Sequence, residues 1–259
     1  MKKRLNIVKV GGNIIEKDED LQSFLEVFSK LPEPKILVHG GGKLASQLAE
    51  RLGIAVKMTN GRRITDAETV EVITMVYGGK VNKSIVAGLQ ARKCNAIGVS
   101  GADGNTILSV KRPVKEVDFG FVGDVVEVDS EMIDKLLSID VTPVFCAITH
   151  DGNGQLLNTN ADTIACELAR GLSDKYDVTL NYCFEKPGVL MDVNDDASVV
   201  REIDREKYSQ MLQDEIIADG MLPKLENCFY ALQCGVTQVK LGKPEMLTKN
   251  HTNFTTLRL

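Results

Sequence analysis

Two short apolar segments that end in glycine clusters constrain the fold of this chain most strongly. Residues 5–10 run into Gly11-Gly12, and residues 36–38 run into the triple glycine at 40–42. Each cluster is followed by a stretch with helical periodicity. A buried strand, a tight turn and a helix in succession are typical of α/β proteins, in which ligands bind at the carboxyl ends of the strands.

The same alternation continues along the rest of the chain. Further buried strands are predicted at 96–99, 141–148, 178–183 and 236–241, and helices at 21–31, 44–52, 66–93, 161–172, 204–211 and 222–234. The helix at 66–93 has a weak point at Gly78-Gly79. Between 107 and 128 the pattern changes to apolar-polar alternation around a turn at 119–123, which predicts a β-hairpin or an antiparallel edge. We therefore predict one α/β domain over 1–259, a three-layer αβα sandwich with a mainly parallel central sheet.

Charge, hydropathy and cysteine usage exclude several classes of partner. The net charge is −5 and the basic residues are spread along the chain, so a nucleic-acid partner is not expected. Apolar runs of about 18 residues, which a membrane span needs, are missing from the sequence. The six cysteines form no CxxC pair, which favours reduced thiols. We expect a cytoplasmic protein that binds neither nucleic acid nor membrane.

Both glycine clusters suit an anion. Lys9 ends the first strand, and Gly11 and Gly12 let backbone amides approach a ligand closely, although an ordinary turn beside a lysine fits the first motif equally well. The second motif, His39-Gly40-Gly41-Gly42-Lys43, places N–H groups at a helix start, where phosphate binds readily. It matches neither the P-loop nor the Rossmann fingerprint. His39 lacks partners spaced to form a metal site, so we predict a structural role for it.

Two polar motifs precede helices. In Asn60-Gly61-Arg62-Arg63-Ile64-Thr65 one arginine could bind a substrate carboxylate with two hydrogen bonds, or both could form ion pairs at the helix start, a role preferred for Arg62. In Asn158-Thr159-Asn160-Ala161-Asp162 one side chain is expected to cap the helix. The remaining ones could bind a polar substrate, and Asp162 could hold two lysine ammonium groups.

A third polar motif, at 218–224, reads Ala-Asp-Gly-Met-Leu-Pro-Lys and enters another helix. Lys224 falls in the first turn of that helix, where its charge opposes the helix dipole. This arrangement is easier to explain if an anion binds there.

In this order the HGGG, NGRRIT, NTNAD and DGMLPK segments resemble the amino acid kinase family, over residues 9 to about 241. The resemblance implies that ATP, with Mg²⁺, donates a phosphoryl group to the side-chain carboxylate of an N-acylated glutamate such as N-acetylglutamate, in arginine biosynthesis. It also implies a homodimer, because the arginine-inhibited hexameric relatives carry an additional N-terminal helix. The acceptor would occupy a lobe at 1–175 and the nucleotide a lobe at 176–259.

The resemblance also implies roles for individual residues. Lys9 and Lys224 would stabilise the transferring phosphoryl group, and Asp162 would organise them. Backbone N–H groups of Gly12, Gly41 and Gly42 would bind phosphate. The acceptor would be bound by Gly41, Gly42, Arg63, Asn158 and Asn160. A protein-held metal is not expected, because Mg²⁺ binds mainly to the phosphates of the nucleotide and to water.

Three alternatives stay open at this point. A kinase of the same fold could act on aspartate, glutamate or carbamate. The acyl group could be succinyl, in which case Arg62 or Lys57 could bind its extra charge. A catalytically weak nucleotide or amino-acid sensor is the third, because Phe184-Glu185-Lys186-Pro187-Gly188 and the tail at 255–257 depart from the family pattern.

Overall fold

A twisted eight-stranded sheet forms the centre of the molecule, in the strand order β12-β14-β13-β11-β1-β2-β8-β5. The computed structural model describes residues 2–59, 61–214, 216 and 221–259. The strands of this sheet are β1 (Lys3–Val10), β2 (Lys35–His39), β5 (Ala96–Val99), β8 (Thr142–Cys146), β11 (Tyr176–Cys183), β12 (Glu202–Ile203), β13 (Gln238–Gly242) and β14 (Thr255–Leu257). Neighbouring strands from β13 to β5 all run parallel, and β14 is antiparallel to β13.

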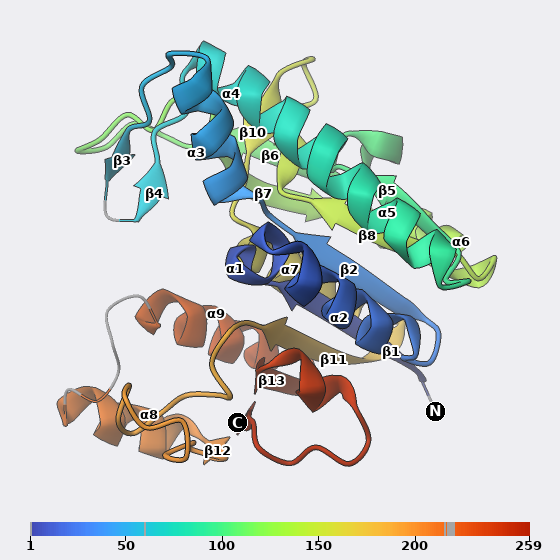
Figure 1. Ribbon diagram of the computed structural model, residues 1–259, viewed down its shortest axis with the longest axis vertical. Helices are drawn as coiled ribbons and strands as arrows, with labels where there is room; N and C mark the ends of the chain where they lie inside the picture. Colours follow the sequence, from blue (N-terminus) through green and yellow to red (C-terminus); the bar gives the residue numbers. More distant parts are fainter. Residues whose placement is uncertain (1, 60, 215, 217–220) are drawn as a thin grey trace.

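Helices cover both faces of this sheet. One face carries α1 (Gly12–Glu16), α2 (Asp18–Ser29) and α5 (Asn82–Ala91), which lie in front of the sheet in Figure 1. The other face packs against α6 (Ser130–Ser138), α7 (Ala161–Leu172) and α9 (Leu222–Gln233). The predicted three-layer αβα sandwich with a mainly parallel sheet is therefore confirmed. Every helix among the described residues is too short or too polar to cross a lipid bilayer.

A second, four-stranded sheet changes two details of the prediction. Its order is β10-β9-β6-β7, from β6 (Ile107–Lys111), β7 (Gly123–Val128), β9 (Ile148–His150) and β10 (Leu156–Asn158). The hairpin predicted between 107 and 128 is the antiparallel pair β6–β7, and it belongs to this sheet rather than to the edge of the central one. The single strand predicted at 141–148 is wrong, because the chain leaves the central sheet after Cys146 and continues as β9.

The helix predicted at 66–93 is continuous but irregular. It consists of α4 (Ala67–Ile73), a π-helical segment η1 (Thr74–Val81) and then α5. The weak point predicted at Gly78-Gly79 lies inside the π-helical segment. Asp66 caps the start of α4, because its side chain accepts a hydrogen bond from the Thr69 N–H. The remaining elements are β3 (Met58–Thr59), β4 (Arg62–Arg63), α3 (Gly42–Arg51), α8 (Arg205–Gln213) and the short 3-10 turns η2 (Asp103–Asn105) and η3 (Pro244–Leu247).

An apolar row on the α7 face of the sheet ends in a lysine. Ile7 pairs in register with Ile36 and Leu180, and all three side chains are buried. Burying each such side chain contributes roughly 1.5–3 kcal/mol to folding. Two residues further along β1, on the same face, Lys9 pairs with Tyr182. Packing of this row therefore holds β1 in the core. The Lys9 ammonium group consequently lies at the carboxyl edge of the sheet.

Candidate active site

Three charged side chains from distant parts of the chain meet at the carboxyl edge of the central sheet. Asp162 lies in the first turn of α7, Lys9 near the end of β1 and Lys224 in the first turn of α9. Asp162 Oδ1 lies 2.8 Å from Lys9 Nζ, and Asp162 Oδ2 lies 2.6 Å from Lys224 Nζ. One carboxylate thus holds two ammonium groups side by side.

The charge state of this cluster favours an anion. The Asp162 side chain is only 19% exposed, and burial by itself would raise the pKa of its carboxyl group. The ammonium groups of Lys9 and Lys224 outweigh that effect and hold the pKa of Asp162 well below its usual range. Two cations and one anion leave the cluster with one net positive charge. Both oxygens of Asp162 face lysines. The uncompensated positive charge therefore lies on the ammonium groups of Lys9 and Lys224.

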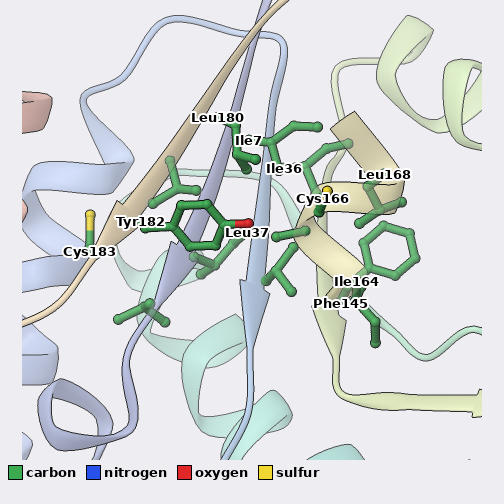
Figure 2. Packing of buried hydrophobic residues seen from close by; sticks show 14 of the residues in the cluster. Ile7, Ile36, Leu37, Phe145, Ile164, Cys166, Leu168, Leu180, Tyr182 and Cys183 are labelled. Atoms are coloured by element: carbon green, nitrogen blue, oxygen red, sulfur yellow. The ribbon is translucent and has the colours of Figure 1, made fainter. Parts of the chain in front are cut away.

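Tyr182 supports this cluster from below, and sequence reasoning missed it. The Tyr182 hydroxyl donates a 3.1 Å hydrogen bond to the backbone carbonyl of Asp162, and Lys224 Nζ lies 5.1 Å from the centre of its ring. Figure 2 shows this ring among buried aliphatic side chains, with its hydroxyl directed toward the helix that carries Cys166. Burial raises the pKa of Tyr182 well above its ordinary value, so it stays a neutral donor. Tyr182 lies opposite Lys9 in the strand register, which the structure shows and no local sequence pattern indicates.

Hydrogen bonds connect two of the predicted acceptor residues, Arg63 in β4 and Asn158 in β10, to neighbouring segments. Arg63 Nη2 donates to the carbonyl of Gly42 at 2.8 Å and to Ser46 Oγ at 2.7 Å. Asn158 Nδ2 donates to Thr65 Oγ1 at 3.0 Å. Arg63 therefore contacts the glycine loop directly, and Asn158 is tied to the same polar segment that carries Arg63. Ser46 and Thr65 were not identified from the sequence.

Asn160 is the helix cap expected among the three polar residues of its motif. Its side-chain Oδ1 accepts hydrogen bonds from the N–H groups of Asp162, at 2.7 Å, and Thr163, at 3.2 Å. The cap fixes the first turn of α7 and with it the Asp162 side chain. Asn160 itself is exposed at the edge of the site.

The predicted phosphate-binding glycines differ in their surroundings. A Cβ atom at Gly12 would meet no described atom within 4 Å, so packing among the described residues does not require glycine there. Gly41 has φ +151°, and a Cβ atom on it would lie 3.0 Å from Tyr77 Cδ1. Gly40 lies close to Ala161, since a Cβ atom on Gly40 would be 3.8 Å from the Ala161 Cβ. The glycine loop, residues 40–42, therefore packs beside the start of α7 and Asp162.

Parts of two sequence motifs, namely Asn60 and residues 217–220, lie outside the described residues. The ion pair at the start of α4 comes from Lys57, whose Nζ lies 3.9 Å from Asp66 Oδ2. Arg62, for which a helix-start ion pair was preferred, instead lines a cavity of about 900 Å³ together with Arg112 and Lys115.

A second cavity, of about 510 Å³, opens where the loops after β1, β2, β11 and β13 meet. Its wall includes Asn13, Lys43, Phe184, Glu185 and Lys243. Asn13 Nδ2 donates to Glu185 Oε1 at 2.7 Å, and Lys43 Nζ donates to Asn13 Oδ1. The Phe184–Gly188 loop, which departs from the family pattern, is thereby linked to both glycine clusters.

Metal-binding groups are scarce in the part of the chain that the structure describes. There, no three His, Cys, Asp or Glu side chains lie together as a metal would require. Asp162, the carboxylate at the centre of the site, is fully engaged by Lys9 and Lys224. The charged groups at the centre of the site are therefore two lysine ammonium groups held by one carboxylate.

Comparison with known proteins gives consistent results. The sequence model of the amino acid kinase family matches residues 4–243. An acetylglutamate kinase of Bacteroides thetaiotaomicron is 58% identical over 250 residues, which cover 96% of this chain and 97% of that protein. An acetylglutamate kinase of Phocaeicola vulgatus is 57% identical over 239 residues, or 92% of this chain and 93% of that protein. The crystal structure of smu.665 from Streptococcus mutans has the same fold, with a TM-score of 0.78 at 23% identity over 98% of both chains.

Proposed function

The chain belongs to the amino acid kinase family, and we propose that it transfers the γ-phosphoryl group of ATP to the side-chain carboxylate of N-acetyl-L-glutamate. The product is an acyl phosphate. The observation that carries this proposal is the pair of lysine ammonium groups held by one buried carboxylate, Asp162, at the carboxyl edge of the sheet. Relatives at 57–58% identity that are named acetylglutamate kinase support the choice of acceptor.

The acceptor needs no general base. A glutamate side-chain carboxyl has an ordinary pKa of about 4.3, so it is ionised at neutral pH and can attack the phosphorus atom directly. The difficulty lies in bringing this anion to the negatively charged ATP. Positioning and charge stabilisation are the main contributions a protein makes to such a transfer.

Lys9 and Lys224 supply the charge stabilisation. During transfer, negative charge spreads over the equatorial oxygens of the phosphoryl group, and the two ammonium groups can each contact it. Asp162 keeps them together and prevents them from drifting apart by mutual repulsion. The negative charge of Asp162 stays on the protein side, because both of its oxygens are occupied by the lysines.

We propose that Mg²⁺ enters as part of the substrate, MgATP. The ion prefers phosphate oxygens and water over a protein cage, and the described residues offer it no cluster of carboxylates. Mg²⁺ neutralises phosphate charge, while the protein residues bind and orient the two substrates.

Residues on the glycine-loop side provide the acceptor contacts. We assign the carboxylate and amide of N-acetylglutamate to Arg63, Asn158 and the N–H groups of Gly41 and Gly42, with Asn160 at the rim. The contact of Arg63 with Gly42 supports this grouping, because it joins two of the assigned elements. Gly12 is assigned to phosphate on the basis of its open surroundings.

This assignment divides the chain by ligand. In this proposal the acceptor is bound within residues 1–175 and the nucleotide mainly within 176–259, with Gly12 contributing to phosphate. The ion pairs of Lys9 and Lys224, one from each part, with Asp162 support a reaction at the boundary. The homodimer and the cytoplasmic location stay predictions.

The experiment that tests the proposal is ADP release from MgATP with four acceptors in parallel: N-acetylglutamate, N-succinylglutamate, glutamate and aspartate. We expect turnover with N-acetylglutamate that is lost in Lys9→Ala. Turnover confined to glutamate or aspartate would show that the proposed acceptor is wrong. Absence of turnover with all four acceptors would favour the alternative that the protein is a sensor.

A further inference from the structure

Two buried polar side chains, Asn82 and His39, connect the exposed Lys83 to the glycine loop and have no role in the function proposed above. His39 and Asn82 are 0% and 1% exposed, although neither belongs to the apolar core by its chemistry. Buried polar side chains are costly unless hydrogen-bonded, so their partners show what they do. Hydrogen bonds connect Lys83 to Asn82, Asn82 to His39, and His39 to the carbonyl of Gly40.

Each hydrogen bond of the Asn82 side chain has a defined donor and acceptor. Lys83 Nζ can only donate, and it lies 3.1 Å from Asn82 Oδ1, which fixes the orientation of the amide. Asn82 Nδ2 then donates to the carbonyl of Val144 at 2.9 Å and to His39 Nε2 at 3.0 Å. Because an amide nitrogen cannot accept, His39 Nε2 is the acceptor in this contact and carries no proton.

His39 therefore holds its proton on Nδ1. That nitrogen lies 2.8 Å from the carbonyl oxygen of Gly40 and donates to it. Burial lowers the pKa of His39 to about 4, against a smaller opposing effect of the Gly40 carbonyl, so the ring stays neutral at physiological pH. Asn82 thus selects the tautomer of His39, and His39 draws the Gly40 carbonyl toward the core.

The direction of the Gly40 carbonyl decides where the next N–H points. The Gly40–Gly41 peptide bond is trans, since the cis bond among the described residues is Glu33–Pro34. In a planar trans peptide the C=O and N–H point in opposite directions. With Gly40 O turned toward the His39 ring, the Gly41 N–H points away from it. Gly41 is buried, and this N–H finds no acceptor among the described residues, so it is an unpaired donor that a ligand could satisfy.

The π-helical segment brings a second support to the same loop. Tyr77 is 5% exposed and its ring packs on Gly41, within 3.0 Å of where a Cβ atom would stand. Tyr77 and Asn82 are five residues apart, which in an α-helix would turn them about 140° from each other. Here the Asn82 N–H donates to the Tyr77 carbonyl, the five-residue hydrogen bond of a π-helix. The wider turn lets the Tyr77 ring reach the glycine loop while the Asn82 side chain reaches His39.

We propose that Asn82 and His39 are positioning residues that aim the Gly41 N–H at the anionic group of the acceptor. They touch no substrate atom and act through the peptide plane between Gly40 and Gly41. Tyr77 prevents the loop from collapsing backward. This inference rests on the proposed function, because it assigns the N-acylglutamate to the Gly41 N–H.

The first test is the tautomer of His39, measured by ¹⁵N–¹H correlation of the imidazole groups in the unmodified chain. The sequence has three histidines, so His39→Gln assigns the signal. We expect the neutral Nδ1–H form at pH 7. A neutral Nε2–H form or an imidazolium at pH 7 would overturn the proposal. This test requires no variant of Asn82 to fold.

The second test compares Asn82→Asp with the matched variant Asn181→Asp. Asn181 is also buried, at 2% exposure, and its amide donates to backbone carbonyls of Ile7 and Thr179, away from the glycine loop. In Asn82→Asp the carboxylate accepts from His39 Nε2 and reverses the tautomer. We expect the KM for N-acetylglutamate to rise about tenfold, with the KM for ATP unchanged within about twofold.

A merely structural role predicts a different outcome. Both variants would then lose thermal stability to a similar degree, and neither would change the ratio of the two KM values. An unchanged ratio in Asn82→Asp, or an equal change in Asn181→Asp, would overturn the inference. Absence of turnover of N-acetylglutamate by the unmodified chain would instead overturn the proposed function, and it is seen before any variant is compared.

Discussion

Among the residues that the structure describes, Asp162 and Asp196 each contact two lysines, but we assign only Asp162 to the candidate active site. Asp162 lies between Lys9 and Lys224 at 2.8 and 2.6 Å, and its side chain is 19% exposed. Asp196 lies between Lys186 and Lys243 at 3.1 and 3.2 Å, and its side chain is 51% exposed. The residue types and the contacts are alike, so the difference lies in their surroundings.

Burial and position separate the two clusters. Hydrogen bonds from Lys186 and Lys243 lower the pKa of Asp196 in water, where the attraction between charges is weak. The pKa of Asp162 is lowered against the effect of burial, which shows how strongly its two lysines act on it. Asp162 also stands at the carboxyl edge beside the glycine loop, whereas Asp196 belongs to an exposed loop. The two clusters therefore differ in burial and in their position relative to the glycine loop, and this difference is the reason that we propose only the Asp162 cluster as a phosphoryl site.

The largest expected effect comes from removing the lysines one at a time. Lys9→Ala and Lys224→Ala should each lower kcat by about 10²- to 10³-fold, because each removes a direct donor to the transferring group. The matched variants Lys186→Ala and Lys243→Ala should stay within about twofold of the unmodified chain. Steady-state ADP release measures both pairs. A comparable loss of kcat in Lys186→Ala would show that the Asp196 cluster also takes part in the reaction. The proposed difference between the Asp162 and Asp196 clusters would then be wrong.

A smaller effect on rate is expected for Asp162→Asn. The variant keeps both ammonium groups but removes the charge that holds them together, so kcat should fall by about 10- to 100-fold. Loss of one partner of a largely buried ion pair should also lower the free energy of unfolding by about 1–3 kcal/mol. Asp196→Asn is the control and should change neither quantity measurably. Urea unfolding followed by circular dichroism supplies the stability values.

Tyr182→Phe should give a still smaller change. It removes the hydroxyl that bonds to the Asp162 backbone carbonyl but keeps the ring beneath Lys224. The expected loss is about 1 kcal/mol in unfolding free energy and roughly three- to tenfold in kcat. Tyr208→Phe on α8 is the control, since its hydroxyl has no hydrogen-bond partner among the described residues. Equal kcat values for Tyr182→Phe and Tyr208→Phe would show that the Tyr182 hydroxyl does not contribute to positioning Asp162.

The smallest effect concerns acid stability. The folded-state pKa of Asp162 is depressed, so its ion pairs stabilise the fold above the ordinary carboxyl value of about 3.9. That contribution is lost as the pH falls toward the lower folded-state value. Between about pH 5 and pH 2 the unfolding free energy of the unmodified chain should therefore drop more steeply than that of Asp162→Asn. Parallel curves would show that the carboxylate is not stabilised by its lysines in solution.

The parts of the fold that sequence could predict have local signals. β1, β2 and the helices after them follow from apolar runs and glycine clusters that are contiguous in the chain. Helix α6 was missed although a local signal existed, because Asp129 caps it and Ile133 and Leu137 are spaced by four residues. The division of 141–148 between two sheets could not be predicted, since residues 143–148 are all apolar and nothing in them marks the change at Ala147.

The candidate site divides in the same way. Lys9, Asp162 and Lys224 stood out because each has a chemistry that its local position does not need. Tyr182 and Asn82 look like ordinary strand and helix residues, and their contacts are with residues 20 and 43 positions away. Only the register of the sheet and the π-helical turn bring them to the site, and neither can be derived from a local pattern.

The central place of β1 has a consequence for biosynthesis. β1 is translated before the other strands of the central sheet, yet one of its two neighbours is β11, which is translated much later. At about 5–20 residues per second, roughly 9–35 seconds separate the two strands. During this interval an apolar strand has one edge without its partner, which is a condition that favours aggregation. The candidate active site combines residues of β1, α7 and α9, so it can form only after α9 has been translated.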